Sequence, residues 1–595
     1  MVMGDAAWAV RIAVLSDIHV TPGNECELML GEAVGEINAG DTEIVLMQGD
    51  LTNEGSDLEL LNVKAILDRV TKPLYVIPGN HENNWSQSAG KTFVDLWGSD
   101  RFAVATDSLA IIGINSGPYM KMGDAHIKQE DLAWLDTELA LLTSTGKRVL
   151  SVCHYPLGAD IDNYIDYLRV LEKYPVVTQI GGHYHTFKHY AAGGIDGLIC
   201  RALDMKDGNY GYSILEIDAD SVHLYDKQLG VEPQLVYAYR ANTVIEPAAP
   251  PADTIKPLPD NVTVTLVHRD EASVFTRVSL DGENVYFGNS LGEARAVSRA
   301  TGEVLWSCKT GASLYSRPAV AGDEVIVPTA DRRLLWIDKR TGEITHSEEA
   351  QGAYVADGVV AGGILYQGGY KSFAAWDVAQ RKLLWECDSI GNYCQAAPAI
   401  DSGCVVFGAW DTRLRCLDRA TGQLRWQWSN GKDARLLSPG NCVPVLAHGK
   451  AIIVAPDRYM TAIDLATGRQ LWRDNSVRYR ESLGVSADGN TVYAKTMDGE
   501  IVAVDAMGDY FTMLWRVDAG LGYDHAPCIV AEAGGIVFAG SRRGILVAVD
   551  PVEHRLLWQC RLGTSELNGI EVDPATGDIY TSLIEGTIWK IAVSR

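Results

Sequence analysis

The C-terminal half of this chain repeats one phrase at nearly constant spacing. An apolar strand, a turn with Gly or Asp and a second strand precede a pattern close to D-x-x-T-G-x-x-x-W. Its seven copies end at Trp306, His346, Trp385, Trp426, Trp472, Trp515 and Trp558. A period of roughly 40–45 residues with short strands is typical of a β-propeller that has one four-stranded blade per repeat. Because a single blade cannot bury both of its faces, this spacing predicts a ring of stacked blades.

A partial unit follows the seventh copy. Residues 567–595 carry the turn sequence DPATGDIYTS and the strand sequence IEGTIWKIAV, but no fourth strand. The strand-like run Val262–Val267 lies before the first blade and can supply the missing strand, which closes the ring and removes an open edge. We therefore expect eight blades, with seven as the alternative if the last unit is only a cap.

Residues 11 to about 230 follow a different pattern, in which apolar strands alternate with helices. The strand-like runs are Ile12–Leu15, Ile44–Met47, Leu74–Ile77, Leu109–Ile114, Arg148–Val152 and Val176–Ile180. Helical stretches between them are Glu25–Asn38, Leu58–Val70, Lys128–Leu142 and Ile161–Lys173. Continuous apolar strands separated by helices predict an α/β domain whose sheet is covered on both faces.

The segment between the two halves contains the Pro- and Ala-rich sequence EPAAPPADTIKPLP and is typical of an extended linker. We therefore predict an α/β domain at residues 1–230, a linker at 231–261 and a propeller at 262–595.

Composition limits the location and the partners. The net charge is -26, so an acidic surface disfavours binding to duplex nucleic acid or to an anionic membrane. The sequence contains no run of 18 apolar residues, so we predict no membrane span. The eleven cysteines include no CxxC or adjacent pair, and the N-terminus lacks the pattern of a secretory signal. We expect free thiols and a cytoplasmic location.

Polar residues of the types that bind metals follow several of the predicted strands in the α/β half. Five of the thirteen histidines of the chain belong to these groups. In chain order the groups are Asp17-x-His19, Gly49-Asp50, Gly79-Asn80-His81-Glu82, His154 and His183-x-His185. A single histidine at a strand end is usually structural, but all five groups in this order at strand ends indicate a functional site.

The mixture of carboxylate, amide and imidazole ligands suits a pair of Mn, Fe or Zn ions better than Ca or Mg. Asp50 has two oxygens and can bridge two ions, which are divalent or trivalent. The expected ligands are Asp17, His19 and His185 at one ion, and Asn80, His154 and His183 at the other. Two such ions clamp a phosphate and generate a bridging hydroxide near neutral pH. His81 remains as a catalytic residue that stabilises the transition state or protonates the leaving oxygen, oriented by Asp50.

Together, D-x-H, GDLTNEG, YVIPGNHE, the single His and GGHYH resemble the calcineurin-like metallophosphoesterase superfamily. They are most similar to its bacterial cyclic-nucleotide phosphodiesterase and glycerophosphodiesterase group. The resemblance covers about residues 10–230 and implies a sandwich of mixed sheets flanked by helices. One departure is Glu82, where many members of that group have Asp.

The repeats resemble PQQ-type, quinoprotein-like propellers. We expect no PQQ, because the adjacent cysteine pair and the export signal of the quinone-dependent dehydrogenases are absent from this sequence.

Together, these features predict a dinuclear metal-dependent phosphoesterase that hydrolyses a small phosphodiester or phosphomonoester. Candidate residues for the substrate pocket flank the metal motifs: Asn53, Asn84, Tyr155 and Tyr184. The propeller is expected to contribute selectivity for the substrate or for a protein or carbohydrate partner. The alternatives are a phosphoprotein phosphatase targeted by its propeller, a non-catalytic propeller scaffold and a quinone-linked oxidoreductase.

Overall fold

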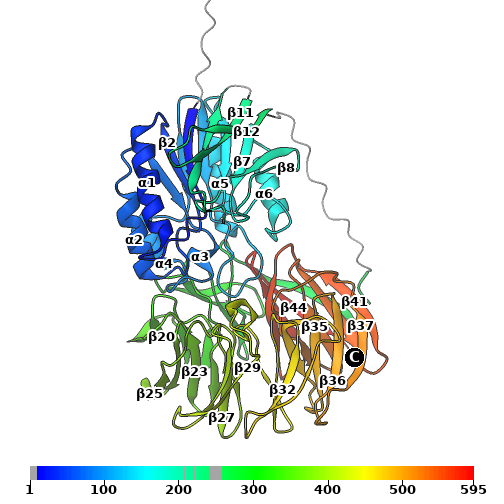
Figure 1. Ribbon diagram of the computed structural model, residues 1–595. Coiled ribbons are helices and arrows are strands. Elements are labelled where there is room, and N and C mark those ends of the chain that lie inside the picture. The colour runs from blue at the N-terminus through cyan, green and yellow to red at the C-terminus, as the bar shows by residue number, and fades with distance from the viewer. Residues whose placement is uncertain (1–9, 207, 219–220, 242–256, 595) are drawn as a thin grey trace, which may run out of the picture. The chain divides into compact units, whose positions relative to one another are not determined.

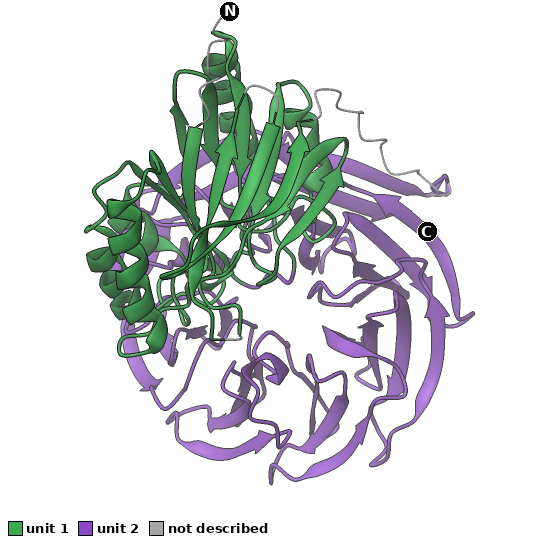
Figure 2. Cartoon of the chain, turned by 45° about the horizontal axis from the view of Figure 1, so that its top comes forward, with its two compact units in different colours: residues 1–120, 124–252 green, residues 121–123, 253–595 purple. Residues whose placement is uncertain are grey.

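The computed structural model describes residues 10–206, 208–218, 221–241 and 257–594. The chain divides into two compact units, residues 1–120 with 124–252 and residues 121–123 with 253–595 (Figure 2). Within the described residues, no helix is long and apolar enough to cross a membrane. All eleven cysteines are free, and nine of them are buried.

The first unit contains two six-stranded sheets and six helices among its described residues. The strands are β1 (Val10–Leu15), β2 (Ile44–Gln48), β3 (Leu74–Ile77), β4 (Phe102–Ala105), β5 (Leu109–Gly113), β6 (Arg148–Val152), β7 (Val176–Gly181), β8 (Lys188–Ala192), β9 (Ile195–Ile199), β10 (Gly211–Ile217), β11 (Ser221–Gln228) and β12 (Gln234–Arg240). The helices are α1 (Glu25–Ala39), α2 (Asp57–Leu67), α3 (Asn80–Asn83), α4 (Lys91–Trp97), α5 (Gln129–Thr143) and α6 (Tyr164–Leu171). The sheet orders are β12-β11-β10-β1-β2-β3 and β4-β5-β6-β7-β9-β8.

The two sheets face each other, and helices cover their outer faces. Along β1, Ile12 and Val14 belong to the core between the sheets, whereas Ala13 and Leu15 pack with α1 and α2. Helices α5 and α6 cover the outer face of the second sheet (Figure 1). Because both faces of the central strands are buried, their sequences are continuously apolar. Both sheets combine parallel and antiparallel pairs, which confirms the predicted sandwich of mixed sheets flanked by helices.

The first unit extends beyond the boundary predicted at residue 230. Strand β12 pairs with β11 at the edge of the first sheet, from Ser221 opposite Arg240 to Asp226 opposite Gln234. The linker predicted at 231–261 therefore begins too early. Every residue of β12 is half-buried or exposed, although the strand contains the apolar run Leu235–Tyr239. The Pro-rich part of that linker, residues 242–256, lies outside the described residues.

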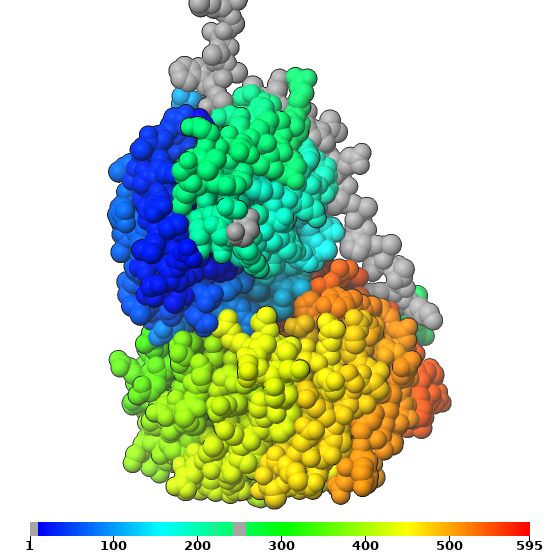
Figure 3. Space-filling view, in the orientation of Figure 1, coloured from blue at the N-terminus to red at the C-terminus, as the bar shows by residue number. Residues whose placement is uncertain are grey.

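The second unit is a β-propeller of eight four-stranded sheets, which confirms the expected blade count and excludes seven. Seven blades are formed by consecutive strands: β14 (Ser279–Leu280), β15 (Asn284–Gly288), β16 (Glu293–Ser298), β17 (Val304–Lys309); β18 (Ala319–Ala321), β19 (Glu324–Pro328), β20 (Arg333–Asp338), β21 (Ile344–Glu349); β22 (Val359–Ala361), β23 (Ile364–Gly369), β24 (Ser372–Asp377), β25 (Lys382–Cys387); β26 (Ala399–Ile400), β27 (Cys404–Gly408), β28 (Arg413–Asp418), β29 (Leu424–Ser429); β30 (Val445–Ala447), β31 (Lys450–Val454), β32 (Met460–Asp464), β33 (Gln470–Asp474); β34 (Tyr479–Val485), β35 (Thr491–Thr496), β36 (Glu500–Asp505), β37 (Met513–Asp518); β38 (Ala531–Ala533), β39 (Ile536–Gly540), β40 (Ile545–Asp550), β41 (Arg555–Arg561). Successive blades follow one another in sequence order across the visible face, from green to orange (Figure 3).

The eighth blade joins the two ends of the ring. It contains β13 (Val262–Arg269), β42 (Leu567–Val572), β43 (Ile579–Leu583) and β44 (Thr587–Val593), in the order β13-β44-β43-β42. Strand β13 pairs antiparallel with β44, from Val262 opposite Val593 to Arg269 opposite Thr587. The strand before the first blade thus completes the last blade, as predicted.

The tryptophan of the repeat packs against the next blade. The indole N–H of Trp306 donates to the carbonyl of Lys339 at 2.8 Å. A Cβ on Gly342, whose φ is 76°, would lie 2.7 Å from the Trp306 ring. The glycine of the T-G pair is therefore required both by the left-handed turn and by this close approach.

Weakening the pairing of β13 tests ring closure. Ser594 N–H donates to the Asn261 carbonyl, so the alternation of an antiparallel ladder also pairs Thr265 with Lys590 through hydrogen bonds. Thr265→Pro removes one donor, and we expect it to lower the free energy of opening β44 by roughly 1–3 kcal/mol. Hydrogen exchange of the β44 amides measures this, with Thr265→Ala as the control. Equal exchange in the two variants would show that β13 does not hold the ring closed.

Candidate metal centre

The predicted ligands meet because the strands that precede them end in register. Leu15 pairs with Met47 in the parallel ladder of β1 and β2, and Gln48 pairs with Ile77 in that of β2 and β3. In the second sheet, Val152 of β6 pairs with Ile180 of β7. The turns that follow these five strands therefore emerge at neighbouring carboxyl ends, where α/β folds place their sites.

The turns hold their ligands in an uncommon backbone conformation. Five of the ligand residues have positive φ, between 46° and 69°: Asp17, His19, Asp50, His183 and His185. Positive φ is rare for residues other than glycine and is concentrated at functional sites. Backbone bonds tie the turns together, since Asp17 N–H donates to Gly49 and Ile18 N–H donates to Asp50, at 3.0 and 2.8 Å.

Glycines in the motifs leave room for the neighbouring ligands. A Cβ on Gly49 would lie 2.7 Å from Nδ1 of His154, and one on Gly79 would overlap the carboxylate of Asp50. A Cβ on Gly182 would overlap Ser16 and the carboxylate of Asp17. The glycines of GD, GNHE and GHYH are therefore needed for close approach between turns.

One group of donor atoms is formed by Asp17, His19 and His185, whose ligand atoms lie within 4.8 Å of one another. Nε2 of His19 lies 3.1 Å from Nε2 of His185, and Nε2 of His185 lies 3.5 Å from Oδ1 of Asp17. The Asp17 carboxylate accepts the His183 backbone N–H at 3.0 Å and the Ser16 hydroxyl at 2.5 Å. These bonds fix the direction of the carboxylate.

A second group contains Asp50, His154 and His183, also within 4.8 Å. Oδ1 of Asn80 lies 3.1 Å from Nε2 of His154 and 3.1 Å from Nδ1 of His183, and therefore belongs to this group. His154 is fully buried, and its Nδ1 donates to the carbonyl of Gln48 at 3.0 Å, which leaves Nε2 for the site.

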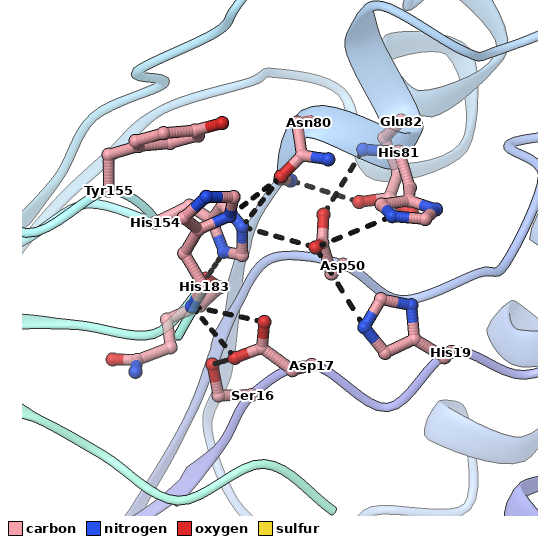
Figure 4. A network of polar contacts seen from close by, with 12 residues as sticks. Ser16, Asp17, His19, Asp50, Asn80, His81, Glu82, His154, Tyr155 and His183 are labelled. Carbon is pink, nitrogen blue, oxygen red and sulfur yellow. Dashed lines mark hydrogen bonds and ion pairs between the residues drawn. The ribbon is translucent and has the colours of Figure 1, made fainter. Parts of the chain in front are cut away.

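Asp50 lies between the two groups (Figure 4). Its Oδ2 is 3.2 Å from Nε2 of His154 and 3.9 Å from Nε2 of His19. Burial favours the protonated acid, but His154 and His81 outweigh it and hold the pKa of Asp50 well below its usual value. The structure thus brings the predicted ligands together around Asp50, whose carboxylate shares one group of donor atoms with His154 and His183 and another with His19 and His81.

His81 was expected not to be a ligand, but its ligand atom lies within 4.8 Å of those of His19 and Asp50. Its Nδ1 lies 2.6 Å from the carbonyl of Asn53, and its Nε2 lies 3.8 Å from Oδ2 of Asp50. Asp50 accepts the backbone N–H of His81 at 3.1 Å. The ring orientation was expected to come from Asp50, but the Asn53 carbonyl makes the shorter contact and directs Nε2 into the site.

Three histidines of the site have strongly shifted proton affinities. Burial lowers the pKa of His19 to about 4 and that of His183 to about 4. Burial also disfavours a charged His154, but the charge and hydrogen bond of Asp50 raise its pKa to about 9. No lysine or arginine is among the principal influences on these histidines.

Two positioning residues, Ser16 and Glu82, were not predicted. Glu82 is fully buried and accepts the Thr52 N–H and hydroxyl at 3.0 and 2.8 Å and the Gly79 N–H at 2.9 Å. Burial and the charge of Asp50 raise the pKa of Glu82. The residue joins the turns that carry Asp50 and Asn80, and its place directly after the Asn-His pair was the available signal in the sequence.

The candidate pocket residues differ in their surroundings. The ring of Tyr155 stacks on His183 at a centroid distance of 3.9 Å, and Tyr184 is 46% exposed. Asn53 contributes its carbonyl to His81, and Asn84 ends α3 by donating its N–H to Asn80. Of these four, Tyr155 and Tyr184 therefore present rings beside a candidate ligand.

The donor set fits two transition-metal ions. Two buried carboxylates, one amide oxygen and four imidazole nitrogens converge here, and such mixtures suit Mn, Fe or Zn. With no lysine or arginine among the principal influences on Asp50, bound cations are the natural source of compensating charge.

Comparison with known proteins agrees with both units. Residues 10–187 match the family model described as calcineurin-like phosphoesterase. Residues 263–358, 352–444 and 375–509 match the model described as outer membrane protein assembly factor BamB. The N-terminal unit is thus a calcineurin-like phosphoesterase domain, and the C-terminal unit is a propeller of PQQ-like repeats.

Individual relatives each match one of the two units. A probable cyclic nucleotide phosphodiesterase from Vesicomyosocius okutanii is 26% identical over 211 residues, which cover 33% of this chain and 87% of that protein. BamB from Yersinia pestis is 20% identical over 236 residues, so the match covers 39% of this chain and 50% of BamB. The crystal structure of BamB from Moraxella catarrhalis aligns with a TM-score of 0.46 and 16% identity, over 56% of this chain and 98% of BamB.

Replacing Glu82 tests whether it positions the metal ligands. In Glu82→Gln an amide N–H2 faces the N–H of Gly79 or Thr52, so we expect metal affinity to fall by about 10–100-fold and stability by roughly 1.5–3 kcal/mol. Glu59→Gln is the matched control, because Glu59 is a buried glutamate that caps α2. Metal titration by calorimetry compares the metal affinity of Glu82→Gln with that of Glu59→Gln. Unchanged affinity in Glu82→Gln would contradict the positioning role.

Proposed function

We propose that this protein is a dinuclear metal-dependent phosphodiesterase. The observation that carries the proposal is the Asp50 carboxylate, which lies between two sets of ligand-type atoms with His81 beside it. Asp17, His19, His185 and Asp50 would hold one ion, and Asn80, His154, His183 and Asp50 the other. Bound there, two such ions would neutralise part of the phosphate charge and would make a hydroxide nucleophile available near neutral pH.

The residues of the chain provide orientation and proton transfer. Ser16 and the His183 N–H fix Asp17, and the Gln48 carbonyl fixes the tautomer of His154. Attack at phosphorus breaks the P–O bond to the leaving oxygen, which needs a proton. His81 supplies it from Nε2, because Nδ1 donates to the Asn53 carbonyl and keeps the ring in that orientation.

Two observations favour a diester over a monoester. The relative from Vesicomyosocius okutanii, which is 26% identical over 211 residues, is described as a probable cyclic nucleotide phosphodiesterase. Beyond the two carboxylates proposed as ligands, Asp160 adds a negative charge near His183, although burial is the largest influence on the pKa of that histidine. A diester carries one negative charge where a monoester carries up to two, so it meets less repulsion there.

The propeller is proposed to select the substrate or a protein or carbohydrate partner, in a protein located in the cytoplasm. Its repeats match a family of propellers, and propeller folds serve many functions. The net charge of -26 favours small phosphorylated substrates over duplex nucleic acid.

A substrate comparison tests the reaction class. The Mn-loaded protein is expected to hydrolyse bis(p-nitrophenyl) phosphate and 3′,5′-cyclic AMP, and Asp50→Asn is expected to lose at least about a hundredfold in kcat/KM because the shared carboxylate becomes a neutral amide. Activity confined to phosphopeptides would instead identify a phosphoprotein phosphatase. No hydrolysis of any of these esters with Mn, Fe or Zn would favour the non-catalytic scaffold.

The role of His81 predicts a dependence on the leaving group. His81→Ala should lower kcat for 3′,5′-cyclic AMP by about 10²–10⁴-fold, since an alkoxide must be protonated as it leaves. Hydrolysis of bis(p-nitrophenyl) phosphate should fall much less, because p-nitrophenolate is a weak base. The control is His189→Ala on β8, whose ring pairs with Asp196 at 3.0 Å. Equal losses on both esters, with metal content unchanged, would rule out proton donation by His81.

A further inference from the structure

An exposed tyrosine lies between two of the candidate metal ligands. Tyr184 separates His183, which belongs to one donor group, from His185, which belongs to the other. Its ring centroid lies 5.1 Å from that of His183, at an interplanar angle of 65°. The side chain is 46% exposed, whereas Tyr155, the other ring beside His183, is more deeply buried. Tyr184 therefore presents an aromatic surface at the border of the ligand cluster.

The ring is held in one orientation by a hydrogen bond. The Tyr184 hydroxyl donates to a carboxylate oxygen of Asp160, and its backbone N–H donates to the Gly182 carbonyl at 2.8 Å. A ring with fixed rotamers loses less conformational entropy when a ligand stacks on it.

Asp160 lies on a loop that is held in place by hydrogen bonds. Ala125 N–H donates to the Asp160 carbonyl at 3.0 Å, and Asp162 N–H donates to the Ala125 carbonyl at 2.9 Å. His126 and Asp162, both almost fully buried, form a contact of 2.7 Å between Nδ1 and Oδ1. The tether of Tyr184 thus ends on a segment that is fixed by backbone bonds and a buried ion pair or hydrogen bond.

We propose that Tyr184, tethered by Asp160, is the surface on which a planar aromatic group of the substrate stacks. The inference rests on the proposed phosphodiesterase function and deepens it, because it assigns the substrates to phosphodiesters that carry a nucleobase. In a nucleotide, the base is separated from phosphorus by the sugar. A ring that borders the ligand cluster without joining it is placed to meet such a group, and stacking accepts any base because every base has a π face.

Two substrates separate stacking from a general effect on the site. The probes are 3′,5′-cyclic AMP and the cyclic phosphate of propane-1,3-diol, which has the same six-membered diester ring and no base. In Tyr184→Leu, the ratio of kcat/KM for the two substrates should fall by about 5–150-fold, mainly through KM for cyclic AMP. Tyr184→Phe keeps the ring and should retain most of the ratio.

A purely structural role of Tyr184 predicts a different result. If the hydroxyl only clamps the loop to Asp160, Tyr184→Phe and Tyr184→Leu lose the same bond and both substrates suffer alike, so the ratio stays constant. The matched control is Tyr174→Leu, because the Tyr174 hydroxyl also donates to an aspartate, Asp136, at 2.7 Å and lies outside the site. That variant should leave the ratio unchanged.

Inhibition provides a readout that is independent of turnover of the diester. Competitive inhibition by adenosine 5′-monophosphate should weaken in Tyr184→Leu by a similar factor, while inhibition by inorganic phosphate should not change. A constant substrate ratio, or equal weakening for both inhibitors, would overturn the stacking role. If the wild-type protein hydrolyses no diester at all, the proposed function itself fails, and that outcome is visible before any Tyr184 variant is compared.

Discussion

The carboxylate of Asp50 is the group on which the arrangement of the site depends. It is almost fully buried, and its oxygen Oδ2 lies within 3.9 Å of imidazole nitrogens from three different turns, those of His19, His81 and His154. A buried carboxylate is unfavourable unless cations or hydrogen bonds compensate for its charge. Two of these three imidazoles, those of His19 and His154, are also proposed metal ligands, so residues that contact the carboxylate form part of the proposed centre.

The rest of the first unit maintains this arrangement through the backbone. Parallel pairing of β1, β2 and β3 brings their carboxyl ends together, and Glu82 bonds the turn after β2 to the turn after β3. The turns reach van der Waals contact because several of their residues have positive φ angles and because their glycines have no Cβ atom. The strain of these turns is local, and the continuous apolar cores on both faces of the sheet support it.

The sequence predicts the ligands better than it predicts their supports. Metal ligands are restricted to a few residue types, and strand ends can be recognised, so Asp17, Asp50 and His154 are identifiable without coordinates. Contacts made by backbone groups, such as the Asn53 carbonyl on His81, leave no trace in residue types. Strand β12 was missed for a different reason: its apolar run Leu235–Tyr239 precedes the Pro- and Ala-rich segment and was assigned to the linker, whereas its identity as a strand depends on pairing with β11.

In the propeller, the sequence repeat was sufficient to predict the number of blades and the closure of the ring. The position of each Trp and T-G pair gave the number of blades, and the strand before the first blade gave the closure of the ring with β44. These features follow from a local period together with the need to remove open edges. The selectivity that we propose for the propeller depends on surface side chains, which differ from blade to blade and have no such period.

The most direct test of the central claim is electron paramagnetic resonance of the protein loaded with Mn²⁺. If Asp50 joins two ions, the wild-type protein at full loading will show a spin-coupled pair, and Asp50→Ala will show either uncoupled single ions or reduced binding. Uncoupled Mn²⁺ in the wild-type protein at full loading, or a coupled pair that persists in Asp50→Ala, would contradict the shared carboxylate.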